Sequence, residues 1–364
     1  MENKVIITVI ALGVLMMSAF ACVLFTDDSD ASGEITITEI GAPNPITVTF
    51  PGPVDHIVSF SKGYTKTAVK LGVFDKIVLM DNGSKYSECG IDETKGLPES
   101  MFINYTASNS ANIVTKMAEL ESQKKFDKNK DVIVVNKFSA SSKQIDDLIS
   151  AGYKVIGYYP KNYDQNIQVT EDLGKLWGSK NYQKVVQSMK DAPVKIKEKL
   201  DEAGIVDEKK VKAVSVSTNK IQTKGSMGGT LIEMGGGINV AADKNPSPTA
   251  TSMASDPTFF AKNKIDILFY SPHNGKSADV YMKEMGISSD VKVVEIGNLW
   301  VSYGSNVDDG LWGYAGSMYP DYFSTSGDVY EPNDSDDKTM IYVGIGVLVL
   351  VAAVGVIYFV YFRQ

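Results

Sequence analysis

The sequence predicts an α/β protein with two parallel-sheet, Rossmann-like lobes, linked by a single long helix and followed by a C-terminal transmembrane helix. Three observations support this prediction. Short Val/Ile-rich runs alternate with helical patterns in two separate stretches, a helical segment lies between these stretches, and an uncharged apolar segment lies close to the end of the chain. The 364 residues are enough for two domains with sizeable cores.

Both ends of the chain are predicted to be directed to a membrane. Lys4 and the uncharged run after it predict a signal peptide or N-terminal anchor over residues 1–25, and cleavage after Ala21 would leave Cys22 first. Residues 340–362 carry no charge and are long enough to cross a hydrocarbon core of about 30 Å as a helix.

The flanks of this C-terminal span predict its orientation. An acidic linker, residues 326–339, precedes the span, and Arg363 follows it. Because positive flanks stay inside, we expect the C-terminus in the cytoplasm and the folded part outside. The sequence therefore predicts a single-pass protein of the cell membrane with an extracellular binding domain.

The N-terminal lobe is expected over residues 34–180. Its strands should be continuous apolar runs, as in strands buried on both faces, at residues 56–60, 76–80, 131–135 and 154–158. Helices are expected between them, at residues 65–71, 111–120 and 142–151. The last of these should begin near Ser142 and end at Gly152. This alternation predicts a parallel sheet.

The linking helix is expected over residues 181–204, and Pro193 should kink it or split it. The C-terminal lobe is expected over residues 209–325. Its predicted strands lie at residues 211–216, 265–270 and 291–296, with helices near residues 230–234, 257–263 and 278–285.

Two glycine-rich segments of the second lobe invite a phosphate-loop interpretation. In TLIEMGGGINVAAD the glycines follow the helical pattern, so Gly235 is expected as a left-handed C-cap rather than as part of a phosphate loop. The segment 225–229 precedes the helix instead. It is either an anion site made of backbone N–H groups or a plain loop.

Composition excludes several functional classes. A net charge of -8 and a pI near 5.0 argue against nucleic-acid binding. Two cysteines cannot form a disulfide framework or a Cys-based metal centre, and His56 and His273 are too far apart in sequence to suggest a bare metal site. Neither a Gly-x-Ser-x-Gly nor a His-Glu-x-x-His motif occurs, so we expect no enzyme.

The order of several weak motifs resembles the cobalamin-, haem- and ferric-siderophore-binding proteins of ABC importers. The resemblance covers residues 35–323 and rests on ITVTFPGPVDHIVSF, TAVKLGVFDKIVLMDN, DVIVVNKFSASSKQIDDLISAGYKVIGYY, VTEDLGKLWG, TLIEMGGGINVAAD and MYPDYF. It implies two lobes, a rigid linking helix, a metal-chelate ligand held between the lobes and an ABC permease as partner. No cofactor is implied, and the identity of the chelate stays open among ferric siderophore, haem and corrinoid.

The resemblance also bears on individual residues. Tyr86 lies where the cobalamin binders have a pocket tyrosine. Family members dock onto the permease through a glutamate on each lobe. This chain has Asp256 in the second-lobe region and no clear glutamate in the first, which leaves that docking mode in doubt.

Aromatic and cationic residues follow the predicted strands, where open parallel sheets bind ligands. Such side chains would suit a large, flat or anionic chelate. The predicted ligand-binding set is Lys62, Tyr64, Tyr86, Phe138, Tyr159, Lys161, His273, Trp300 and Tyr303. Alternatively, these aromatics merely cover the sheet edge, and His273 is a surface residue rather than an axial ligand. For the whole protein, the alternative is a surface adhesion or scaffold protein without transport.

Overall fold

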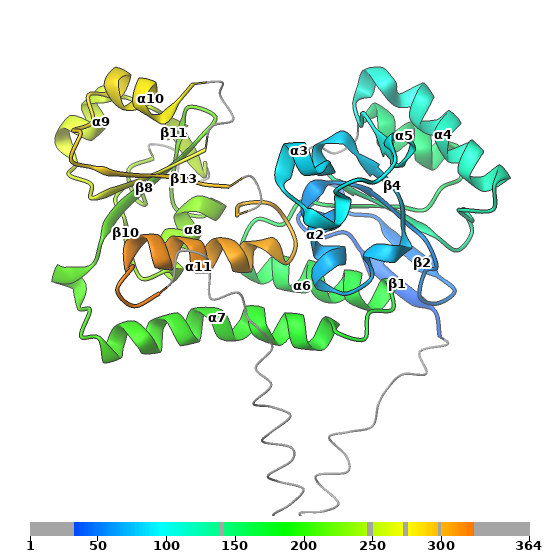
Figure 1. Ribbon diagram of the computed structural model, residues 1–364, viewed down its shortest axis with the longest axis horizontal. Helices are drawn as coiled ribbons and strands as arrows, with labels where there is room; N and C mark the ends of the chain where they lie inside the picture. The colour runs from blue at the N-terminus through cyan, green and yellow to red at the C-terminus, as the bar shows by residue number, and fades with distance from the viewer. Residues whose placement is uncertain (1–32, 138–141, 246–249, 272–275, 298–299, 324–364) are drawn as a thin grey trace, which may run out of the picture.

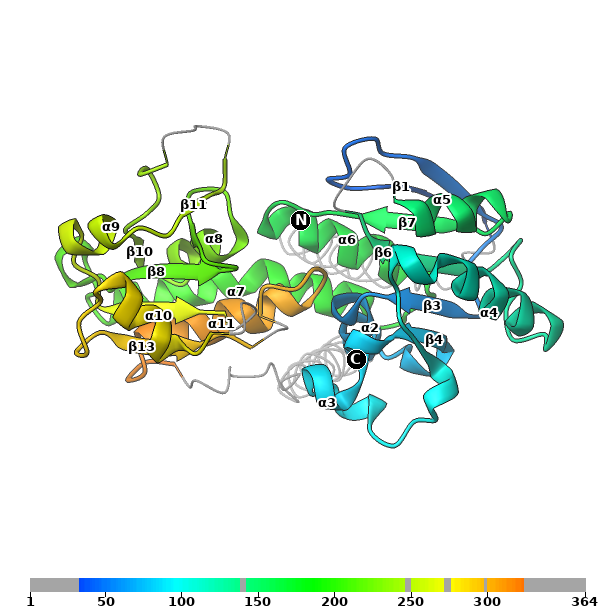
Figure 2. The same ribbon diagram turned by 90° about the horizontal axis from the view of Figure 1, so that it is seen from above.

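The computed structural model describes residues 33–137, 142–245, 250–271, 276–297 and 300–323. Within these residues the chain forms two α/β lobes that lie side by side, with the long helix α7 (Tyr182–Glu202) running beneath both (Figure 1 and Figure 2). The architecture of two lobes and one long linking helix is therefore as the sequence predicts.

The predicted membrane-directed segments, residues 1–25 and 340–362, lie outside the described residues, as does the acidic linker at 326–339. Across the part of the chain that the structure describes, no helix combines the length and apolar character needed to span a membrane.

Lobe one is built on a five-stranded parallel sheet with the order β5-β4-β3-β6-β7. The four predicted apolar runs all form strands, and a fifth, only two residues long, was not predicted. Strands buried on both faces explain the continuous apolar runs. The strands are β3 (Ile57–Phe60), β4 (Ile77–Asp81), β5 (Phe102–Ile103), β6 (Val132–Asn136) and β7 (Val155–Tyr158).

Helices cover both faces of this sheet. Side chains of α2 (Lys62–Lys70) and α6 (Tyr163–Leu176) pack on one face, where Trp177 completes the core. The other face is covered by α4 (Ser110–Ser122) and α5 (Lys143–Ser150). The short helix α3 (Tyr86–Cys89) follows β4.

An antiparallel hairpin precedes the sheet. It consists of β1 (Ile35–Thr38) and β2 (Thr47–Phe50) and forms a separate two-stranded unit. The amide of Tyr159, just after β7, donates a hydrogen bond of 2.9 Å to the carbonyl of Ile40. The hairpin connection therefore lies along the outer edge of lobe one.

The linking helix α7 continues through Pro193, so of the two expected outcomes, a kink or a split, the split does not occur. A proline has no amide hydrogen and leaves the carbonyl four residues earlier, that of Met189, without its helical donor. The hydroxyl of Tyr163 donates to this carbonyl at 3.0 Å. A side chain from the neighbouring helix α6 therefore supplies the missing hydrogen bond.

Lobe two has a mixed sheet, which corrects the prediction of a wholly parallel one. Its order is β11-β9-β8-β12-β13, with β10 also paired to β8; β9 and β11 run antiparallel to their neighbours. The strands are β8 (Lys212–Ser217), β9 (Lys220–Gln222), β10 (Ile238–Asn239), β11 (Ser252–Ala254), β12 (Ile267–Tyr270) and β13 (Lys292–Glu295).

The antiparallel part begins with a two-residue turn between β8 and β9. Thr218 and Asn219 both have left-handed backbones, with φ of 51° and 56°. This is the turn geometry that favours a tight hairpin. The lobe is completed by α8 (Met227–Met234), α9 (Pro257–Lys262), α10 (Ala278–Met285) and α11 (Asn306–Met318).

The three consecutive glycines do end a helix, but the left-handed residue is one position later than expected. Helix α8 stops at Met234, Gly235 keeps a negative φ, and Gly236 has a φ of 87°. A Cβ on Gly235 would lie 2.8 Å from the carbonyl oxygen of Leu231, so close packing requires glycine there too.

Candidate functional site

The main group of predicted site residues that the structure brings together lies at the junction of the two lobes. The ring of Tyr159 meets the ring of Tyr303 edge to face, with centroids 5.7 Å apart. The ammonium group of Lys161 lies 3.0 Å from the centroid of the Tyr159 ring. Tyr159 and Lys161 follow β7 of lobe one, whereas Tyr303 comes from the segment between β13 and α11 of lobe two. The arrangement offers aromatic faces beside a cation.

Helix α2 holds Tyr303 in place. A Cβ on Gly63 would lie 2.5 Å from the carbonyl oxygen of Tyr303, so the two backbones touch. The side-chain amide of Asn306 donates to the carbonyl of Gly63 at 2.7 Å. Burial, with Tyr159 as a further cause, raises the pKa of the Tyr303 hydroxyl. Tyr303 is therefore neutral at physiological pH.

The segment after Tyr303 fastens lobe two to lobe one a second time. The amide of Gly304 donates to the side chain of Asn166 at 2.7 Å, and the amide of Ser305 donates to the hydroxyl of Thr67 at 3.1 Å. The ammonium of Lys70 lies 2.6 Å from the Asp309 carboxylate. We call the contacts of residues 303–309 with α2 and α6 the second joint. Together with α7, it gives two connections between the lobes.

A buried carboxyl group belongs to this second joint. Asp308 is 6% exposed and accepts a hydrogen bond of 3.2 Å from the hydroxyl of Tyr163. Burial raises its pKa to about 6, while the positive charge of Lys70 acts in the opposite direction. The joint therefore contains a group that titrates just below neutral pH.

Lys62 and Tyr86 lie on a neighbouring part of lobe one. Lys62 is the first residue of α2, and burial lowers its pKa against the attraction of the Cys89 and Asp81 side chains. Tyr86 begins α3, is 43% exposed, and has the ammonium of Lys95 5.3 Å from its ring centroid.

Tyr64 belongs to the protein core, which corrects its assignment to the ligand site. It is the third residue of α2 and is completely buried against the sheet. Its hydroxyl donates to the carbonyl of Tyr158 at 3.4 Å, and the two rings pack edge to face with centroids 6.0 Å apart. The helical position of Tyr64 turns its side chain inward, so it has no face to offer a ligand.

Trp300 also packs on the protein itself. A Cβ on Gly313 would lie 2.6 Å from its ring, and one on Gly310 would lie 2.1 Å from its carbonyl oxygen. The Trp300 ring also contacts that of Tyr314, with centroids 6.1 Å apart. Gly310 and Gly313 of α11 thus leave space for Trp300. The repeated glycines of the sequence GLWGYAG are the signal that could have indicated this close packing. The remaining predicted residues, Phe138 and His273, lie outside the described residues.

Sequence reasoning missed the polar residues of the second joint. Thr67, Asn166 and Asn306 are all completely buried, and each makes a hydrogen bond across the lobe junction. Polar residues within helical patterns are usually exposed. Their role depends on a contact between segments far apart in the sequence, which no local pattern shows.

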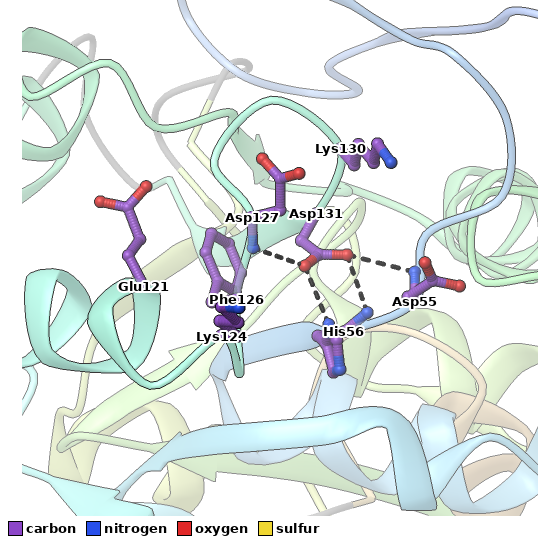
Figure 3. A pocket seen from close by; sticks show the side chains of 8 residues that line it. All are labelled: Asp55, His56, Glu121, Lys124, Phe126, Asp127, Lys130 and Asp131. Atoms are coloured by element: carbon purple, nitrogen blue, oxygen red, sulfur yellow. Dashed lines mark hydrogen bonds and ion pairs between the residues drawn. The ribbon is translucent and has the colours of Figure 1, made fainter.

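A separate cavity of about 390 Å³ lies at the opposite end of the lobe-one sheet, where β3 and β6 begin (Figure 3). Its central residue, Asp131, is 1% exposed and accepts hydrogen bonds from the amides of Asp55, His56 and Asp127 at 2.8 to 3.1 Å. The Nδ1 atom of His56 lies 3.0 Å from the same carboxylate. His56 is thus part of a structural clamp at the start of β3 and β6, as its position at a strand start suggests.

In the part of the chain that the structure describes, no group of three or more His, Cys, Asp or Glu side chains is arranged so that it could hold a metal ion. Two other segments considered from the sequence, residues 225–229 and the region of Asp256, cap the helices that follow them. In the segment 225–229, the hydroxyl of Ser226 accepts from the amide of Gly229 at 3.0 Å and caps α8. Asp256 caps α9 by accepting from the amide of Thr258 at 2.8 Å.

Comparison of the sequence with protein-family models and with curated proteins finds no match. Solved structures do show similarity. RhuT, a periplasmic haem-binding protein from Roseiflexus sp. RS-1 in apo form, matches with a TM-score of 0.56 and 15% identity, over 73% of this chain and 98% of that one. CeuE of Helicobacter pylori, in a Ni-His complex, matches with a TM-score of 0.58 and 15% identity, over 82% of this chain and 97% of that one.

A third structure, from an ABC-type Fe3+-hydroxamate transport system of Saccharomonospora viridis, matches with a TM-score of 0.56 and 16% identity. It covers 78% of this chain and 98% of that one. The matches span nearly the full length of each of these proteins. This chain therefore has the fold of the periplasmic solute-binding proteins, as the order of motifs in its sequence indicates.

Proposed function

We propose that this protein is an extracytoplasmic solute-binding protein that captures a metal chelate and delivers it to an ABC permease. The observation that carries the proposal is the Tyr159–Tyr303 ring pair with Lys161 beside it, at the junction of two lobes with the solute-binding-protein fold. Clefts between domains are favoured ligand sites. The protein binds and releases its ligand without chemical change.

The chemistry of these residues supports a flat or anionic chelate. Two aromatic faces provide apolar contact area, and the Lys161 ammonium provides a positive charge for carboxylate or hydroxamate oxygens. Haem, ferric siderophores and corrinoids share these properties. RhuT binds haem and the Saccharomonospora protein belongs to a Fe3+-hydroxamate system, so both classes are tested first.

We further propose that residues 340–362 tether the binding lobes to the cell membrane, with the lobes outside and the C-terminus in the cytoplasm. The support is the uncharged sequence itself, since the segment lies outside the described residues. Alkaline carbonate extraction of membranes tests the tether. The full chain should stay in the membrane pellet, and a chain ending at residue 326 should be released when residues 1–25 have been cleaved. Release of the full chain would refute the tether, and retention of both chains would assign the anchoring to residues 1–25.

The decisive experiment is thermal unfolding of the full chain in lipid nanodiscs with cobalamin, haemin, ferric siderophores and free divalent metals. A ligand at 100 times its Kd stabilises the folded state by about 2.7 kcal/mol. Empty nanodiscs control for partition of haemin into lipid. A higher Tm with one chelate class supports the proposal and identifies the ligand. No shift with any chelate would contradict it.

A matched pair of variants places the site. Tyr159→Ala should lower the affinity for the stabilising chelate by about tenfold or more, because ring contacts of this kind contribute about 1 to 3 kcal/mol. Tyr322→Ala, at a tyrosine of lobe two that is 37% exposed, is the control and should leave affinity unchanged. Equal effects of both substitutions would place the ligand elsewhere.

A further inference from the structure

The N-terminal hairpin contributes a buried ion pair to lobe one. The ammonium of Lys137 and the carboxylate of Glu39 are 2.8 Å apart, and their side chains are only 5% and 2% exposed. Lys137 directly follows β6, and Glu39 directly follows β1. The pair therefore ties the hairpin to the end of the sheet at which Tyr159 also lies.

Each charged group of this pair is fully engaged. One carboxylate oxygen of Glu39 accepts from the amide of Gly157 at 2.7 Å, and the other accepts from the amide of Ile46 at 3.0 Å. The Lys137 ammonium also donates to the carbonyl of Asn44 at 3.3 Å. Burying two charges costs several kcal/mol per ion unless such bonds compensate, and apolar replacements are often as stable. Stability alone therefore does not explain the pair.

The hairpin holds the outer edge of β7 at two alternate amides. Gly157 donates to the Glu39 carboxylate, and Tyr159 donates to the carbonyl of Ile40 at 2.9 Å. The next residue, Gly41, has a φ of 71°, and a Cβ there would lie 2.0 Å from the carbonyl oxygen of Tyr159. Ile40 and Gly41, which follow β1, thus contact the backbone of Tyr159 at both its amide and its carbonyl group.

We propose that the buried Glu39–Lys137 pair is a positioning device for the ligand site. By locking residues 39–41 against β7, it fixes the backbone of Tyr159, and through it the ring that meets Tyr303 and Lys161. Sites must be held to within about 0.5 Å by their supporting residues to bind well. The expected effect of the ion pair on ligand affinity rests on the proposed function. Its effect on the backbone of Tyr159 does not.

The chain provides a matched control. Lys154, one residue before β7, fastens the far end of the hairpin: its ammonium donates to the carbonyl of Thr49 at 2.6 Å and lies 4.9 Å from the ring centroid of Phe50. Lys154→Met therefore removes a lysine contact to the same hairpin without touching Tyr159. Lys137→Met removes the proposed device, and Lys137→Arg keeps its charge and aliphatic stem.

The first measurement is amide hydrogen exchange of the full chain in nanodiscs without ligand. Lys137→Met should accelerate exchange at the Tyr159 amide by about tenfold or more, whereas Lys154→Met should not, and Lys137→Arg should restore slow exchange. If Lys137→Met does not fold, Glu39→Gln, which keeps the shape of the side chain, replaces it. Unchanged exchange at Tyr159, or equal acceleration by Lys154→Met, would overturn the inference.

The second measurement is affinity for haemin and for ferrioxamine, each titrated into the same variants. Lys137→Met should weaken binding of the chelate that stabilises the wild type by about tenfold, while Lys154→Met should change it less than about twofold. Equal weakening by both variants would assign the pair a merely structural role. If no chelate of the thermal-unfolding panel binds the wild type, the proposed function fails, and the exchange result alone decides the positioning role.

Discussion

Replacing Asp308 by asparagine should stabilise the protein at neutral pH. The Asp308 carboxyl is buried at the second joint, and burial raises its pKa to about 6 from an ordinary value of 3.8. When the pKa of a carboxyl group is higher in the folded state, there is a pH range in which the folded protein still holds the proton and the unfolded chain has lost it. Stability therefore falls as pH rises from about 4 to about 6, and the full loss remains at pH 7.5.

The size of the effect follows from the two pKa values. A difference of about 2 pH units corresponds to about 3 kcal/mol at 25 °C, and we expect about 2 to 3 kcal/mol from Asp308→Asn at pH 7.5. The charged groups that face this carboxyl are Lys70, Lys195 and Asp309, and Lys70 keeps Asp309 as its partner in the variant. The asparagine oxygen can still accept from the hydroxyl of Tyr163.

Urea unfolding at pH 7.5 and at pH 4.5 measures the effect. The variant should be more stable than the wild type by about 2 to 3 kcal/mol at pH 7.5 and by only about 1 kcal/mol at pH 4.5, where Asp308 keeps its proton in the folded protein but has largely lost it in the unfolded chain. Asp309→Asn removes a half-exposed carboxylate of the same joint and is the control, with an expected loss of at most about 1 kcal/mol. A difference between Asp308→Asn and wild type that is the same at both pH values would refute the reasoning.

Two further substitutions test the packing of the helices that join the lobes. Tyr163→Phe leaves the Met189 carbonyl without a donor and should cost about 1 to 3 kcal/mol in urea unfolding. Adding Pro193→Ala, which restores a helical amide, should recover much of this loss. If the double variant shows the simple sum of the two single effects, the assignment of this hydrogen bond is contradicted. Gly313→Ala places a methyl group 2.6 Å from the Trp300 ring and should lower stability by about 1 to 3 kcal/mol; an unchanged Tm would show that the ring is free to move.

Local patterns predicted the elements whose surroundings are uniform. The runs that became β3, β4, β6 and β7 are buried on both faces, so their side chains are continuously apolar. Helix α5 begins after Ser142 and ends before Gly152, whose φ is 89°. The antiparallel strands of lobe two were missed, because β9 and β11 have only three residues each, and the turn at Thr218 and Asn219 lacks the usual glycine.

Predictions failed where a distant residue decides the outcome. Pro193 stays within a continuous helix because Tyr163, from another helix, supplies a hydrogen bond. Tyr64 follows a strand in sequence but lies on the buried side of α2, so its position after a strand was a poor guide. Tyr159 and Tyr303 were predicted as members of one ligand-binding set, but only the fold shows that their two rings meet.

The second joint also has a consequence for the order in which contacts between the lobes can form during synthesis. Its hydrogen bonds connect α2 with residues more than 230 positions later, such as those from Asn306 to Gly63 and from Lys70 to Ser305. Contacts this distant close late, because a long loop must be ordered first. The contacts within lobe one need only residues up to α6, but Tyr303 reaches Tyr159 only after the chain has been made to residue 303 or beyond. A nascent or truncated chain that ends before residue 303 therefore lacks the Tyr159–Tyr303 ring contact and the hydrogen bonds of the second joint.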